Sequence, residues 1–215
     1  MKKLIITLLA FSFLAHTGCR KRDSEEGVSQ VVDVTFPTIN LKGDKFVSLS
    51  VGESYTDPGA TAIDDITGAQ SEITAEFSNL DPSTPGMYYM LYSAKNANGY
   101  IQNNVRYIAV TNYNDAVDLT GTYKRTANGV LVEVTKVAPS MYKNADMGGA
   151  GIADALYFVI IDDSTIAAGP QFSESLGTEI ETGSEGLSLD NPYTFQYALG
   201  APGYGTAVRV FVKQE

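Results

Sequence analysis

Histidine, cysteine and tryptophan are almost missing from this chain. Its 215 residues contain one histidine, His16, one cysteine, Cys19, and no tryptophan. Beyond Cys19 there is no imidazole or thiol, which excludes Ser-His-Asp and Cys-His catalysis and leaves zinc no nitrogen or sulfur ligand. The chemistry that remains is that of carboxylates, as in glycosidases or in a hard-cation site. We therefore expect no cofactor.

Positive charge is scarce as well. The chain has 15 lysines and arginines against 25 aspartates and glutamates, which gives a formal charge of −10. An acidic surface repels phosphate backbones and anionic lipid headgroups. The charge therefore argues against nucleic acid as a partner and against direct adsorption to a membrane.

The first nineteen residues have the pattern of a bacterial lipoprotein signal peptide. Lys2 and Lys3 precede an apolar run from Leu4 to Ala15, which is shorter than the roughly 20 residues of a membrane-spanning helix. Residues 14–19 resemble the lipobox of bacterial lipoproteins, with His16 where leucine is usual. We expect Cys19 to carry a fatty acid such as palmitate and to anchor the chain in the outer membrane, facing the cell surface. The alternative is an ordinary secretory signal with an incidental cysteine.

The remaining chain divides by composition into a tether and two domains. Residues 20–30 are polar and charged, and they predict a disordered linker. Residues 31–112 predict a domain of short strands, and residues 113–215 predict a second antiparallel β domain, either a sandwich or a partly closed barrel. The predicted fold class is therefore all-β.

Short alternating segments in residues 31–110 predict strands separated by turns. The clearest strand, residues 87–94, has two apolar faces, one with Tyr88, Met90, Tyr92 and Ala94 and the other with Met87, Tyr89 and Leu91. Residues 96–99 predict a hairpin turn and residues 100–110 its partner strand. The Pro85-Gly86 pair before Tyr88 predicts a tyrosine corner, in which the phenol bonds back to the backbone.

Residues 51–60, Asp64-Asp65 and residues 85–99 resemble the bacterial Ig-like domain first named in an insecticidal crystal protein. The resemblance implies that residues 31–112 are an Ig-like β-sandwich, a spacer or adhesion module of cell-surface proteins without catalytic residues. Asp57, Asp64 and Asp65 are weak candidates for calcium ligands, since such residues more often cap turns and calcium takes six to eight oxygens.

The second domain predicts further hairpins and two loop-rich stretches. Residues 130–137, 156–161, 193–199 and 206–213 predict strands, whereas residues 142–154 and 172–190 predict loops. Residues 118–125 and 134–137 are similar to the C-terminal domain of surface lipoproteins from Gram-negative gut commensals, in which an Ig-like domain comes first. This resemblance implies an architecture and a location rather than a ligand.

Four aromatic residues predict a binding site in the second domain. Tyr142, Phe172, Tyr193 and Tyr204 lie in or beside predicted loops, where exposed rings suit the apolar faces of sugars. The alternative is that these rings fill the ends of the core. Glu174, Glu179, Glu181 and Glu185 match no glycosidase motif and predict a solvated acidic face, and Asp162-Asp163 predicts a hairpin turn.

The sequence therefore predicts a surface protein that captures a polysaccharide or host glycan and is not an enzyme. The competing hypothesis is a structural or adhesive lipoprotein whose partner is another surface protein.

Overall fold

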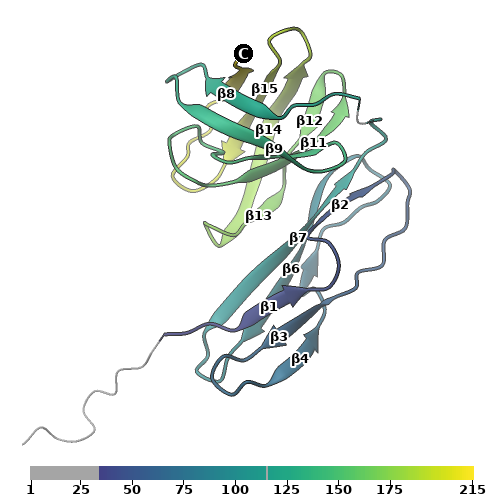
Figure 1. The fold of residues 1–215 in the computed structure, drawn as a ribbon, viewed down its shortest axis with the longest axis vertical. Coiled ribbons are helices and arrows are strands. Elements are labelled where there is room, and N and C mark those ends of the chain that lie inside the picture. The colour runs from purple at the N-terminus through teal and green to yellow at the C-terminus, as the bar shows by residue number, and fades with distance from the viewer. Residues whose placement is uncertain (1–33, 115) are drawn as a thin grey trace, which may run out of the picture. The chain divides into compact units, whose positions relative to one another are not determined.

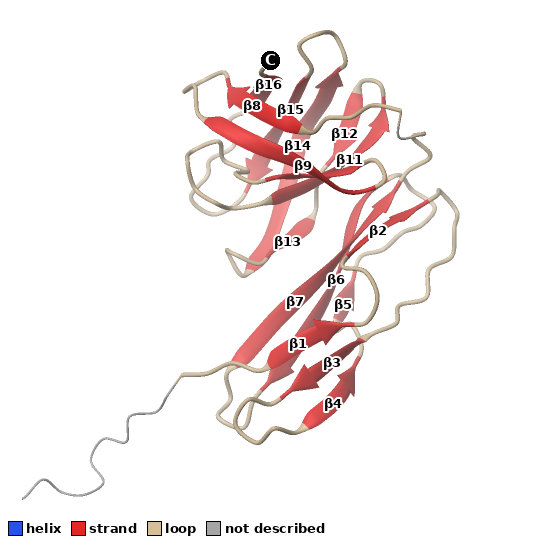
Figure 2. Cartoon of the chain, viewed as in Figure 1, coloured by secondary structure: helices blue, strands red, loops and turns tan. Residues whose placement is uncertain are grey.

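A computed structural model describes residues 34–114 and 116–215. The predicted signal peptide, Cys19 and the tether of residues 20–30 lie outside the described residues. Every regular element in the described part is a β-strand (Figure 2), which confirms the all-β prediction. No helix in the described part is long and apolar enough to cross a membrane.

The N-terminal domain is a sandwich of two sheets. Its three-stranded sheet has the order β1-β3-β4, and its four-stranded sheet has the order β2-β7-β6-β5, with β2 parallel to β7. The strands are β1 (Thr38–Leu41), β2 (Phe46–Leu49), β3 (Ala60–Ile63), β4 (Gln70–Ile73), β5 (Phe77–Ser78), β6 (Gly86–Lys95) and β7 (Ile101–Val110). The predicted hairpin is therefore present as β6 and β7.

The tyrosine corner is confirmed at the start of β6. The Tyr88 hydroxyl donates a hydrogen bond of 2.8 Å to the backbone carbonyl of Thr84, four residues upstream. The ring therefore ties the entry of β6 to the preceding turn, while Met90 and Tyr92 on the same face are buried in the core between the two sheets.

The C-terminal domain is one nine-stranded sheet that curls into a half-barrel (Figure 1). Its order is β12-β11-β10-β9-β8-β16-β15-β14-β13. The strands are β8 (Gly121–Arg125), β9 (Leu131–Ala138), β10 (Met141–Asn144), β11 (Leu156–Asp162), β12 (Thr165–Ala167), β13 (Gln171–Ser173), β14 (Thr178–Ser188), β15 (Thr194–Gly200) and β16 (Arg209–Lys213). Of the two predicted architectures, the partly closed barrel is the observed one.

The curl brings the two ends of the sheet order together. The amide of Leu187 on β14 donates 2.8 Å to the carbonyl of Ser164, which precedes β12. The amide of Ala168, just after β12, donates 2.9 Å to the Glu185 carboxylate. Six aromatic residues fill the interior of the half-barrel: Tyr123, Tyr142, Phe158, Phe195, Tyr197 and Phe211.

One loop prediction in this domain is wrong, and another is wrong only at its start. Much of the acidic stretch 172–190 forms β13 and β14, whereas the predicted loop 142–154 is present from residue 145 onward, after residues 141–144, which form β10 and pair with β9 and β11. Polar and glycine-rich residues hid these strands. Their backbone groups pair within the sheet even though β14 has a bulge between Gly183 and Gly186.

A third apolar cluster joins the two domains, and Thr35–Glu215 form one compact unit. Met87 and Tyr89, on the second face of β6, pack in one cluster with Tyr157 and Val159 of β11. Both strands therefore bury both faces, which explains their nearly continuous apolar runs. The predicted division between residues 112 and 113 stays a prediction.

Candidate functional site

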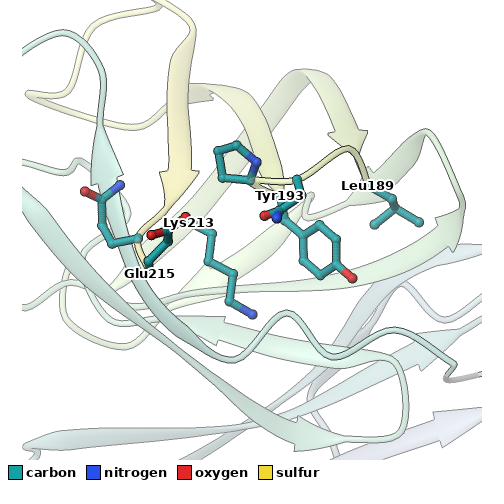
Figure 3. Close-up of a pocket in the computed structure, with 7 residues that line it drawn as sticks. Leu189, Tyr193, Lys213 and Glu215 are labelled. Atoms are coloured by element: carbon teal, nitrogen blue, oxygen red, sulfur yellow. The ribbon is translucent and has the colours of Figure 1, made fainter.

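A hollow of about 470 Å³ opens beside Tyr193, at one end of the half-barrel. Figure 3 shows the Tyr193 ring and the Lys213 side chain extending side by side in this hollow. The hollow is lined by Leu189, Asn191, Pro192, Tyr193, Lys213, Gln214 and Glu215. Among the four predicted aromatic residues, Tyr193 is the one that lines it.

Strand pairing and turn chemistry hold the Tyr193 ring in place. Asn191-Pro192 forms the bend before β15, and the backbone amide of Lys213 donates 2.8 Å to the Tyr193 carbonyl. The Lys213 ammonium lies 5.2 Å from the centre of the Tyr193 ring and donates 3.2 Å to the carbonyl of Asp118. One contact of the ring is therefore a cation–π interaction.

The carboxylate of Asp118, whose backbone carbonyl accepts from Lys213, is ionised at neutral pH. The backbone amide of Thr120 and the nearby Lys213 ammonium hold the pKa of Asp118 below its usual value. An aromatic ring, an ammonium, amides and a carboxylate then border one small hollow. This combination can pack against the C–H face of a sugar while its polar groups bond the hydroxyls.

Tyr142 and Phe172 are not at a loop surface, and the prediction that they are exposed is wrong. Tyr142 lies on β10 with its ring fully buried in the half-barrel, and its hydroxyl donates 2.8 Å to the Val117 carbonyl. Phe172 lies on β13 in the apolar cluster between the domains, where its carbonyl accepts 2.8 Å from the Tyr107 hydroxyl. Both rings are core residues, as the alternative interpretation of the sequence had it.

Tyr204 is partly buried and lies at the other end of the half-barrel. Its hydroxyl donates to the Asp154 carboxylate, and the Arg209 guanidinium lies 5.9 Å from the ring centre. Burial and the Asp154 hydrogen bond raise the pKa of Tyr204 to about 12. The structure therefore does not bring Tyr204 and Tyr193 into one site.

The weak calcium candidates make protein contacts instead. Asp57 pairs with Arg106 at 2.5 Å, Asp64 accepts the amides of Ile66 and Thr67, and Asp65 accepts from Asn96. In the described part of the chain, no three His, Cys, Asp or Glu side chains gather in a way that could hold a metal ion.

Three of the four glutamates on the predicted acidic face also have partners. Glu174 forms an ion pair of 2.8 Å with Lys45, Glu179 accepts from the Tyr89 hydroxyl, and Glu185 accepts from the Thr182 hydroxyl at 2.6 Å. The first two of these contacts join the two domains. Asp162 accepts from the Ser164 amide at 2.8 Å, which confirms the predicted hairpin turn.

Sequence reasoning missed the polar residues around Tyr193. Asn191, Gln214 and Glu215 share no motif, since two of them follow β16 and the other precedes β15. They meet because β15 and β16 are antiparallel, with Thr194 opposite Val212. The Asn-Pro pair before an aromatic residue was the available local signal.

Residues 39–110 match the family model described as the Ig-like domain of bacterial surface proteins. The N-terminal domain is therefore Ig-like. Its predicted link to insecticidal crystal proteins and to gut commensals stays a prediction. Comparison with curated protein sequences gave no significant match.

Two solved structures are similar to this chain. A lipoprotein from Bacteroides thetaiotaomicron shares 23% identity over 83% of this chain and 100% of its own, with a TM-score of 0.36. The CBM51-2 and INT domains of ZmpB from Clostridium perfringens, in complex with GlcNAc, share 13% identity over 82% of this chain and 44% of theirs, with a TM-score of 0.27.

Proposed function

We propose that this protein is a lipid-anchored cell-surface protein of the outer membrane that captures a polysaccharide or host glycan. The signal-peptide pattern and Cys19 support the anchor, and the Ig-like domain of bacterial surface proteins supports the location. The observation that carries the binding role is the hollow of about 470 Å³ in which the Tyr193 ring meets amide, carboxylate and ammonium groups.

The Ig-like domain would serve as the spacer that carries the binding domain. Its contacts with the C-terminal domain include the Lys45–Glu174 ion pair and a hydrogen bond of 2.8 Å from the Thr111 hydroxyl to the Ile160 carbonyl. A spacer with these contacts would carry the hollow on the Ig-like domain. The proposal includes no catalysis, because three of the candidate carboxylates are engaged in protein contacts.

The experiment is affinity electrophoresis and calorimetry of the full mature chain against a panel of neutral and acidic polysaccharides. We expect Tyr193→Ala to weaken binding about tenfold, which corresponds to about 1.4 kcal/mol, because the stacking face is lost. Tyr193→Phe should keep most of the affinity. Tyr100→Ala, which removes a partly exposed ring of the Ig-like domain, is the matched control and should bind as the wild type does. Undiminished binding by Tyr193→Ala, or no binding by the wild type, contradicts the proposal.

A second candidate function is adhesion to a protein partner. Leu131 and Val208 are 60% and 44% exposed on the C-terminal domain, and a protein partner that covered them would remove apolar surface from water. Retention on insoluble polysaccharide separates the two functions, since an adhesion protein would pass through.

A further inference from the structure

Two arginines lie in a polar layer at the Tyr204 end of the half-barrel. Arg125 is opposite Phe211 in the pairing of β8 with β16, and Arg209 is opposite Tyr197 in the pairing of β16 with β15. Phe211 and Tyr197 are buried in the barrel core, so the register places both arginines on the interior face. Diagonal neighbours on adjacent strands lie about 7–8 Å apart between Cα atoms, within reach of long side chains.

Neither guanidinium has a carboxylate partner among the described residues. Arg209 is 3% exposed and donates to the carbonyls of Ala207, at 2.8 Å, and Tyr204, while Arg125 donates 3.4 Å to the carbonyl of Gly149. The Nε atoms of both arginines are buried without a hydrogen-bond partner. Burial and the nearby Arg125 charge lower the pKa of Arg209. Arg209 is buried, Arg125 is half-buried, and no carboxylate of the described residues bonds either guanidinium, so the layer favours an added anion.

A buried acceptor lies in the same region. Asp146 is 7% exposed, and its Oδ2 accepts the amides of Gly151, at 2.6 Å, and Ile152, at 3.2 Å. Its Oδ1 is buried without a hydrogen-bond partner. Five buried side-chain nitrogen or oxygen atoms in the described residues lack partners, and three of them are these two Nε atoms and this Oδ1. The layer therefore offers two charged donors and one acceptor.

Two loops cover this layer. Tyr204, in the loop before β16, packs so closely on Gly148 that a Cβ there would lie 2.5 Å from its ring. A Cβ at Gly149 would lie 2.6 Å from Arg125 Cδ. The Tyr204 hydroxyl donates to Asp154 and so joins the two loops. A ligand would enter by separating Tyr204 from Asp154.

We propose that this layer binds a hydroxy-carboxylate, such as a uronic acid. The carboxylate would lie between Arg125 and Arg209, and a hydroxyl would donate to Asp146 Oδ1. The Asp146 charge disfavours a dianion such as phosphate in the same place. The site is distinct from the Tyr193 hollow, since Arg209 and Lys213 are four residues apart on β16, about 13 Å. The carboxylate has two possible sources, a captured acidic glycan and a free sugar acid. This inference rests on the proposed function only for the first source.

The experiment measures thermal unfolding and calorimetric binding of the full mature chain with glucuronate, acetate, glucose and sodium chloride at equal ionic strength. We expect glucuronate to raise the unfolding midpoint most, acetate less, and glucose and chloride not at all. A polysaccharide that contains glucuronate, tested beside free glucuronate, distinguishes the two sources by which of them binds.

Arg125→Gln should weaken glucuronate binding at least tenfold, because it removes one of the two charges. Lys124→Gln, on the outward face of the same strand, is the matched control and should leave binding unchanged. Arg125→Lys keeps the charge but removes the Nε donor, so it gives a second test if Arg125→Gln does not fold, and it should also bind at least tenfold more weakly.

Three results would overturn the proposal: no shift with either carboxylate, an equal shift with chloride, or wild-type binding by Arg125→Gln and Arg125→Lys. Tyr193→Ala should keep the glucuronate shift, and Arg125→Gln should keep any binding of neutral polysaccharide. Failure of this site and failure of the proposed function are therefore distinguishable.

Discussion

At the residue scale, Asp57 lies in a turn, yet its carboxylate bonds side chains in the interior of the Ig-like domain. Its carboxylate accepts from the fully buried Arg106, at 2.5 Å, and from the Tyr92 hydroxyl, at 2.6 Å. Arg106 also donates 2.8 Å to the Tyr55 hydroxyl and 2.5 Å to the Lys42 carbonyl. The pair explains why an aspartate occurs in the Asp-Pro-Gly turn, which has no calcium-like arrangement around it.

Removing one partner of this ion pair should be strongly destabilising. Asp57→Ala leaves the Arg106 charge buried, and we expect a loss of about 3–5 kcal/mol in the free energy of unfolding measured in urea. Asp44→Ala, at an exposed position of the same domain, should change it by less than about 0.5 kcal/mol. A loss below about 1 kcal/mol for Asp57→Ala would show that the Arg106 charge finds another partner.

Tyr142 and Tyr193 show that the neighbours of a residue in sequence do not decide whether its side chain is buried. Tyr142 stands next to a glycine-rich stretch, and Tyr193 stands next to an Asn-Pro bend, so both were predicted at a surface. Pairing of β10 with β9 and β11 buries Tyr142, whereas Tyr193 precedes β15 and stays at a hollow. Local turn chemistry therefore does not separate the buried Tyr142 from the half-buried Tyr193.

At the scale of elements, β11 is a strand that packs against both domains, one with each of its faces. Phe158 and Ile160 point into the half-barrel, while Tyr157 and Val159 pack against the Ig-like domain. The Tyr157 ring centre lies 4.2 Å from that of Tyr107 and 5.0 Å from that of Phe46. The apolar run of residues 156–161 thus has a separate partner for each face.

Truncation of Tyr157 should therefore destabilise the domain pair. We expect Tyr157→Ala to lower the free energy of unfolding in urea by about 3–5 kcal/mol, because it leaves a cavity beside the rings of Tyr107 and Phe46. Tyr100→Ala, which removes a more exposed ring, should cost much less. If both variants cost the same, the contact between the domains does not contribute to stability in solution.

At the scale of the whole molecule, buried phenols dominate the titration at high pH. Burial is the main cause that raises the pKa of Tyr113, Tyr157 and Tyr204 to about 12, and it raises the pKa of Tyr107 and Tyr197 as well. An unfolded chain exposes these phenols with a pKa near 10. The folded state therefore holds more protons than the unfolded state above that pH.

The sign of this linkage predicts alkaline unfolding. The stability from neutral phenols should be fully present below about pH 10 and lost as the pH rises through about 12. Urea unfolding at pH 8, 9.5 and 11, with tyrosinate absorbance at 295 nm recorded in parallel, measures it. Tyrosinate formation and loss of the fold should coincide. Ionisation of most phenols near pH 10 in a folded protein would contradict the burial described here.

The sequence by itself determined the all-β class, the β6–β7 hairpin, the tyrosine corner and the Ig-like domain. The first three depend on alternation or turn chemistry within a short stretch, which is local information, and the Ig-like domain depends on the resemblance of residues 51–60 and 85–99 to a known family. Only the tertiary structure decided that the second sheet curls, that Tyr142 and Phe172 are core residues, and that β6 and β11 cover each other. An alternating strand shows that both of its faces are apolar, but long-range pairing decides which surface covers each face.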